Sequence, residues 1–208
     1  MKIKSFLAAM LLVLCAAVCL SAQTQAPSPE RNDETNLETQ LYLLIGTNQE
    51  VDNVKLPVSL EPVVKELRST LPFKNYRLAA TMINRVKNEG RLDLSWVGGT
   101  LSAPTGAASA ITPSFSQFKV RQIKLVHNSE NQPVVQMLGF NFGARIPIQT
   151  PGAIAANGAV APTVAYENTG VSTDISMREG EPVIVGTLNI GPSGDAIILV
   201  VAAKRTQK

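Results

Sequence analysis

The segment Val171-Ser-Thr-Asp-Ile-Ser-Met177 alternates apolar and small or polar side chains over its whole length. Successive side chains of a β-strand point to opposite faces, so this period of two is typical of a strand with one face in the core and one in solvent. The segment therefore predicts a half-buried strand and, with it, a sheet formed by the sequence on either side.

Toward the C-terminus the sequence predicts two more strands. Glu179-Gly-Glu181 turns the chain into Val183 to Ile190, which predicts a hairpin from Arg178 to Leu188. Gly191-Pro-Ser-Gly194 turns it again into Ala196 to Ala203, which is apolar throughout. A strand without a polar face is buried on both sides, so we expect Ala196 to Ala203 at the centre of a sheet.

Further strands are expected toward the N-terminus. Phe115 to His127 and Val134 to Ile148 read as strands, separated from their neighbours by two small-residue loops at 98–113 and 149–162, and we expect the first of these loops to be mobile. Ahead of them, Tyr76 to Lys87 and the alternating residues Leu92 to Val97 flank the turn Asn88-Glu-Gly90. This arrangement predicts an antiparallel hairpin packed on a helix.

That helix is expected between a first strand at Leu37 to Gly46 and the strand at Tyr76. Ser59 is the expected N-cap, Pro62 falls in the first turn, and Pro72 ends the helix. Its apolar residues recur at spacings of three and four and form one face: Leu60, Val63, Val64, Leu67 and Leu71. The fold class is therefore α+β, mainly antiparallel β, with one amphipathic helix near the N-terminal side of the mature chain.

The first 22 residues read as a secretory signal peptide. Lys2 and Lys4 supply positive charge, Phe6 to Leu20 is apolar, and small residues at Ser21 and Ala22 predict cleavage after Ala22. The alternative is an uncleaved anchor, but the apolar run is shorter than the roughly 17 to 25 residues of a spanning helix. We expect a flexible leader at 23–36 and no membrane span in the mature chain.

Cleavage would leave a chain without thiols and with almost no net charge. Both cysteines, Cys15 and Cys19, lie in the apolar stretch, which excludes thiolate nucleophiles, CxxC chemistry and thiolate metal sites from the mature protein. Loss of Lys2 and Lys4 lowers the formal charge from +3 to +1, with 17 basic against 16 acidic residues. We expect no nucleic acid as a partner, because no basic stripe with interleaved aromatics remains.

Residues that could carry chemistry are few. His127 is the single histidine, no Gly-x-Ser-x-Gly elbow or phosphate loop is present, and no acidic cluster has calcium-loop spacing. Glu179 and Glu181 flank Gly180 and are expected to be solvated turn residues. Trp96 and Tyr166 could form a sugar platform, but single aromatics on strands more often lie in the core. We expect no enzyme, no cofactor and no metal.

One region resembles a known family. Its first half is Gly143-Ala-Arg-Ile-Pro147-Ile, a small-residue loop, and then Val164-Ala-Tyr166-Glu-Asn-Thr-Gly170-Val-Ser-Thr-Asp-Ile175. Its second half is Arg178-Glu-Gly180-Glu-Pro-Val-Ile-Val-Gly186-Thr-Leu188. In this order they resemble the core of the bacterial secretins, the outer-membrane channel subunits of type II and type III secretion and of type IV pili. The family-like residues are Gly143, Pro147, Tyr166, Gly170, Gly180 and Gly186.

The resemblance covers about Gly139 to Ala203 and implies a β-rich subunit that assembles in many copies into a double β-barrel. Secretin subunits are much longer, so it implies a short, reduced relative. The domain prediction is a signal peptide at 1–22, a leader at 23–36, a small α+β unit at 37–97, a loop at 98–113 and a β-rich secretin-like unit at 114–208.

Two functions follow as hypotheses. The first is an exported structural or assembly protein of a bacterial secretion or pilus system, in the periplasm or at the outer membrane. Its partners would be further copies of itself or other envelope components. The second is a free-standing periplasmic or secreted α+β binding module that uses its two small-residue loops. Long open edge strands would favour assembly, whereas a closed sheet with covered edges would favour the binding module.

Overall fold

The computed structural model describes residues 35–50, 56–98, 101, 113–150, 163–190 and 194–206. Residues 34–208 form one compact unit. The predicted signal peptide lies outside the described residues, as do almost all of the leader and most of the loops at 98–113 and 149–162. In the described part of the chain, no helix has the length and apolar character needed to cross a membrane.

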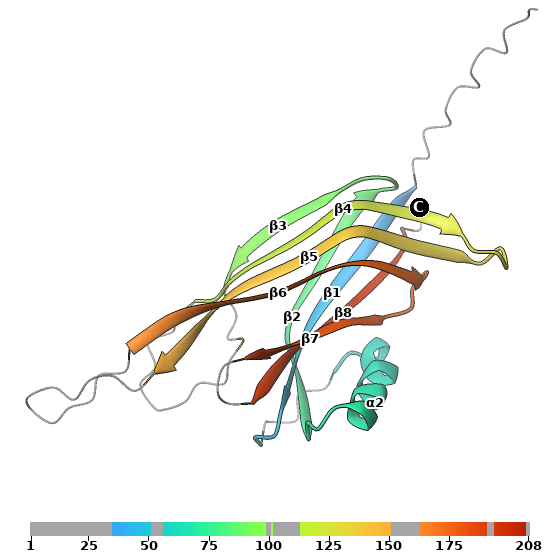
Figure 1. Cartoon of the computed structure of the whole chain (residues 1–208). Coiled ribbons are helices and arrows are strands. Elements are labelled where there is room, and N and C mark those ends of the chain that lie inside the picture. The colour runs from blue at the N-terminus through green and yellow to red at the C-terminus, as the bar shows by residue number, and fades with distance from the viewer. Residues whose placement is uncertain are drawn as a thin grey trace, which may run out of the picture. The chain divides into compact units, whose positions relative to one another are not determined.

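The described residues form two four-stranded antiparallel sheets and one short α-helix (Figure 1). Sheet A has the order β2-β1-β8-β7, and sheet B has the order β3-β4-β5-β6. The strands are β1 (Asn36–Thr47), β2 (Asn75–Lys87), β3 (Leu92–Val97), β4 (Phe115–His127), β5 (Pro133–Thr150), β6 (Thr163–Arg178), β7 (Val183–Ile190) and β8 (Asp195–Arg205). The mainly antiparallel β prediction is confirmed.

The principal core lies between the two sheets. Phe118 and Phe140 of sheet B are fully buried, with ring centroids 5.2 Å apart, and belong to one cluster with Leu41 and Leu43 of sheet A. A second cluster lies on the other face of sheet A, beneath the helix. The two middle strands of sheet A, β1 and β8, contribute to both clusters, which explains the continuous apolar runs Leu41 to Ile45 in β1 and Ala196 to Ala203 in β8. The predicted central position of Ala196 to Ala203 is confirmed.

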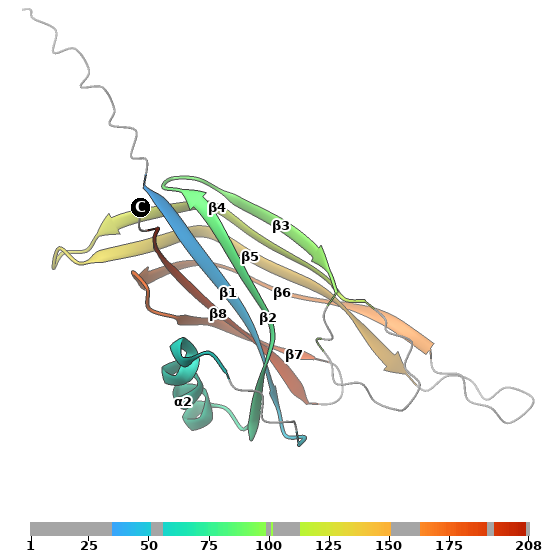
Figure 2. The ribbon, with the colours of Figure 1, turned by 180° about the vertical axis from the view of Figure 1, so that it is seen from behind.

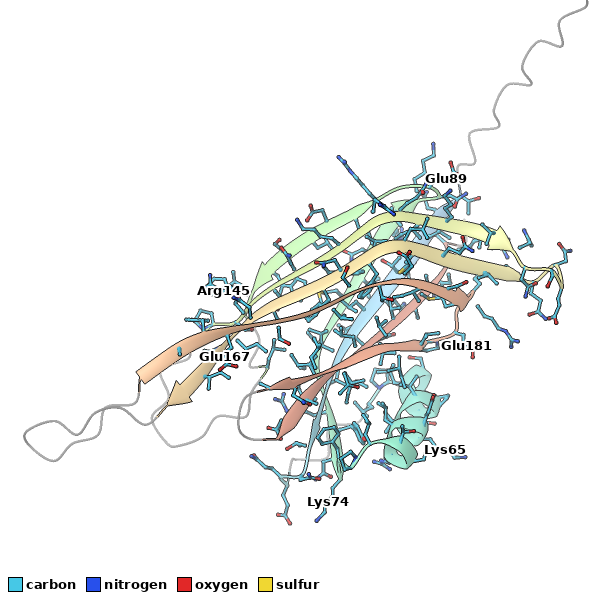
Figure 3. The ribbon with its side chains drawn as sticks, viewed as in Figure 1. Lys65, Lys74, Glu89, Arg145, Glu167 and Glu181 are labelled. Carbon is cyan, nitrogen blue, oxygen red and sulfur yellow. The ribbon has the colours of Figure 1, made fainter. Side chains whose placement is uncertain are left out.

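The helix α2 (Glu61–Thr70) follows a 3-10 turn at Val58–Leu60 and covers the outer face of sheet A (Figure 2). Its buried residues are Val63, Val64 and Leu67, and Lys65 points away from the sheet (Figure 3). The predicted N-cap was wrong: the N-cap is Leu60, with no side-chain hydrogen bond, because Ser59 belongs to the 3-10 turn.

Both tight turns predicted as hairpins are instead corners between the sheets. After β2 the chain passes Asn88–Gly90 into β3 of the other sheet, so β2 pairs with β1 and β3 pairs with β4. The turn is hydrogen-bonded to β4: the Glu89 N–H donates to the Ile123 carbonyl at 2.8 Å, and the Gly90 carbonyl accepts from the Ile123 N–H at 2.9 Å. Asn88 Oδ1 accepts from the Leu125 N–H at 2.8 Å.

The second corner joins β6 to β7. The Gly180 N–H donates to the Ala203 carbonyl of β8 at 2.7 Å, with Gly180 at a φ of +81°. The predicted hairpin of Arg178 to Leu188 was therefore wrong, whereas Val183 to Ile190, the strand before the Gly191–Gly194 turn, does pair with β8. Each corner places neighbouring strands in different layers, so residues from 37–97 and from 114–208 contribute strands to both sheets.

Candidate functional site

The family-like residues on β5 and β6 lie directly opposite one another. Gly143 pairs with Gly170, and Pro147 pairs with Tyr166. In the sequence these partners are separated by the loop at 149–162, so the antiparallel ladder brings together the two ends of the motif's first half. The segment around them is the candidate functional site, at the end of sheet B nearer that loop.

Gly170 is required by the close approach of the two backbones. A Cβ at this position would lie 2.5 Å from the carbonyl oxygen of Phe142, a distance that real side chains do not adopt. At Gly143 a Cβ would meet only the flexible side chain of Gln117, at 3.4 Å. The two glycines therefore differ: Gly170 has a steric requirement, and Gly143 tolerates more.

Tyr166 and its neighbours form an aromatic and cationic group on one face of sheet B. The Tyr166 hydroxyl donates to the Pro113 carbonyl at 3.2 Å, and its ring lies 5.9 Å from the Phe115 ring. The Arg145 guanidinium carbon lies 5.6 Å from the Tyr166 ring centroid, within range of a cation–π interaction. In Figure 3, Arg145 and Glu167 point to opposite sides of the sheet.

The second half of the motif holds the corner and the start of β7. Gly186 follows a β-bulge in β7, and a Cβ there would lie 3.7 Å from the Val171 side chain of β6. Glu179, next to Gly180, accepts hydrogen bonds from the backbone N–H and the guanidinium of Arg205, between 2.8 and 3.0 Å. These bonds hold the pKa of Glu179 below its ordinary value, although burial opposes the shift.

Glu179 is therefore not the solvated acid that its turn position predicts, because its side chain is only 15% exposed and is bound by Arg205. Glu181 is exposed, as predicted. Trp96 packs toward the core near Phe142, with ring centroids 6.4 Å apart. Tyr166, by contrast, is 37% exposed.

Two further residues of sheet B can be located. His127 is the last residue of β4 and lies opposite Pro133. Lys119 forms an ion pair with Asp93 across the β3–β4 ladder, at 3.3 Å. Within the described ranges, no three His, Cys, Asp or Glu side chains gather as a metal site would require.

A cavity of about 500 Å³ lies at the same end of sheet B and involves all four strands. Sequence reasoning missed it, because it depends on the alignment of four strands rather than on any local pattern. The Oγ atom of Ser116, which is buried, has no hydrogen-bond partner among the described residues. The lining residues are Ser95, Trp96, Val97, Phe115, Ser116, Gln117, Gly143, Ala144, Arg145, Asn168 and Thr169.

Each outer strand of sheet B has a partner strand on one side among the described residues. In the described parts of the chain, β3 pairs only with β4 and β6 only with β5. Three of the exposed large apolar side chains lie on these two strands: Val97 on β3, and Val164 and Tyr166 on β6. Exposed apolar side chains on an open edge strand are a typical site for pairing with another chain.

No protein-family model matches the sequence, and no curated protein matches it. Similar solved structures include the InvG secretin domain β-barrel of the Salmonella SPI-1 injectisome, with 10% identity over 84% of this chain and 64% of that chain, at a TM-score of 0.36. The V. cholerae type IV competence pilus secretin PilQ aligns at 10% identity over 84% of this chain and 58% of that chain, with a TM-score of 0.33.

The Klebsiella pneumoniae type II secretion system outer membrane complex of PulD, PulS and PulC HR domain also aligns, at 10% identity, a TM-score of 0.33 and 84% of this chain. The alignment covers 39% of that chain. This chain thus spans less than two thirds of each of these proteins, and its likeness to secretin domains is a distant one.

Proposed function

We propose that the chain is an exported, secretin-related structural protein that assembles in the envelope of a bacterium as part of a secretion or pilus system. The observation that carries the proposal is the pairing of the family-like residues. Gly143 lies opposite Gly170 and Pro147 opposite Tyr166, so separated parts of the sequence resemblance form one structural unit.

The strand arrangement supports assembly. Each sheet has four strands, all antiparallel to their neighbours, so its two edge strands run in opposite directions. A second copy placed edge to edge in the same orientation would therefore meet an antiparallel partner, and every copy added would repeat the same contact. Such a head-to-tail contact forms a ring when its rotation closes.

The role proposed is mechanical rather than catalytic, and the N-terminal apolar segment supports the export that it requires. The open edges of sheet B favour assembly over the free-standing binding module, because a module that acts alone is expected to cover or blunt its long edge strands.

The test is the mass of the assembled protein. We would express the full chain with its own N-terminus in a Gram-negative host, extract the envelope in mild detergent, and measure the mass by light scattering. The proposal predicts a particle of many copies in the envelope fraction. A monomer at high protein concentration, both with and without detergent, would overturn it.

A further inference from the structure

The two sheets present different edges to a second copy. Both edge strands of sheet A carry a β-bulge. Ala79 is the extra residue of β2, opposite the step from Leu43 to Leu44, and Val185 is the extra residue of β7. A bulge breaks the regular spacing of N–H and C=O groups and increases the local twist, which disfavours pairing with another strand.

The corners also cover backbone that would otherwise be open. β4 continues beyond the end of β3, and there Asn88 to Gly90 bond the backbone at Ile123 and Leu125. β8 continues beyond the end of β7, and there Gly180 and Glu179 bond Ala203 and Arg205 in the same manner. Interior strands that overhang their neighbours are thus capped within the copy.

Sheet B keeps regular edges over the same length. Six successive rungs of the ladder cross all four strands. The first aligns Leu92 of β3 with Thr173 of β6, and the last aligns Val97 of β3 with Asn168 of β6. Its bulge lies in the interior strand β5, where the Gly139 N–H donates to Asp174 Oδ1 at 2.5 Å. Neither β3 nor β6 has an extra residue, so the edge groups of both strands keep their regular spacing.

The side chains at these two edges suit one another. Val97 of β3 is 62% exposed and shares a rung with Asn168 of β6. Tyr166 and Val164 lie on the same face as Asn168, because the side chains of a strand alternate. If β3 of a second copy lay beside β6 at this level, its Val97 would be buried next to Tyr166 of the first copy. On the inner face, Leu94 of the second copy would lie beside Val171 of the first, and the apolar face would continue from one copy to the next.

We propose that copies of this chain join through sheet B alone, the β3 edge of one copy pairing antiparallel with the β6 edge of the next. Sheet A does not pair between copies, so the assembly has one continuous β-sheet wall instead of two. This inference rests on the proposed function and adds to it the contact between copies.

Cysteine cross-linking tests the contact. The parent is the full chain with Cys15→Ala and Cys19→Ala. Val97→Cys is combined in turn with Tyr166→Cys, Asn168→Cys and Ser172→Cys, three exposed positions on one face of β6 that cover register offsets of two and four residues. Two strands separate β3 from β6 within a copy, a span of roughly 14 Å, so a disulfide forms only between copies.

The matched control series addresses sheet A. Thr81→Cys on β2 is combined in turn with Ile184→Cys, Thr187→Cys and Asn189→Cys on β7; Thr81 and Ile184 share one rung. Each double variant is oxidised in the detergent extract and separated on a non-reducing gel, and its mass before oxidation is measured by light scattering.

We expect a ladder of covalent multimers in at least one member of the sheet B series and in none of the sheet A series. Ladders in the sheet A series, alone or together with sheet B, would overturn the inference and leave the proposed function standing. A large particle without ladders in either series would do the same. A monomer before oxidation would overturn both.

Discussion

At Gly170 the backbones of β5 and β6 leave no room for a side chain. A Cβ would lie 2.5 Å from the Phe142 carbonyl oxygen, and backbone cannot move aside as a flexible side chain can. We expect Gly170→Ala to lower the free energy of unfolding by about 2 kcal/mol, within the range of a strained substitution in packed structure. Urea denaturation followed by circular dichroism measures the change.

Gly143→Ala is the control, because it changes the paired glycine and meets only the Gln117 side chain. It should change the free energy of unfolding by less than about 0.5 kcal/mol. Equal losses in the two variants would contradict the steric explanation and would point to a general preference for glycine in this part of the ladder.

At the scale of elements, the corner between β6 and β7 depends on Glu179 and Arg205. The bonds from Arg205 hold the pKa of Glu179 below the ordinary value of 4.5 in the folded chain. A carboxyl whose pKa is lower when folded contributes stability that is fully present above its unfolded pKa and is lost as the pH falls through the folded value. The corner should therefore be strongest at neutral pH.

Glu179→Gln should lower the free energy of unfolding at pH 7 by about 1 kcal/mol, a modest value because Arg205 is half exposed. The difference between wild type and variant should shrink as the pH falls below about 4.5, because the unfolded chain takes up a proton at Glu179 before the folded chain does, and it should be gone below the lowered pKa of the folded chain. Urea titrations at intervals from pH 7 to pH 3 measure it. A difference that stays constant with pH would exclude the carboxylate as its source.

Most strands could be predicted from local patterns, but their partners could not. The strand at Phe115 to His127 was predicted with its observed bounds, and the apolar run at Ala196 to Ala203 indicated a central position. The turn at Asn88 to Gly90, by contrast, reads as a hairpin, and only the bonds from Ile123, over thirty residues later, show that it is a corner.

The candidate site was predictable to the same degree. The resemblance pointed to Gly143, Pro147, Tyr166 and Gly170, but the register that pairs them is a long-range property. The Arg145 contact with Tyr166 and the cavity across four strands also arise from that register, and no local pattern indicates them.

At the scale of the whole molecule, the fold blunts or caps some strand edges and leaves others regular, and a charge placed on an edge can test which edge is used. Ser172 on β6 and Thr187 on β7 are both exposed residues of edge strands, one in each sheet. A lysine there is expected to have little effect on the isolated fold, since exposed substitutions change stability by about 0.5 kcal/mol or less. Against a neighbouring strand, however, its charge would have to lose water, which opposes pairing.

Ser172→Lys should therefore convert the assembled particle to monomers or short fragments, while Thr187→Lys leaves its mass unchanged. Light scattering of the detergent extract gives the mass, and urea denaturation of each variant verifies that the fold is retained. The reverse result, with assembly lost only in Thr187→Lys, would place the contact on sheet A. The edge that tolerates no charge is the edge that joins the copies, because only there does a second strand replace the water around the side chain.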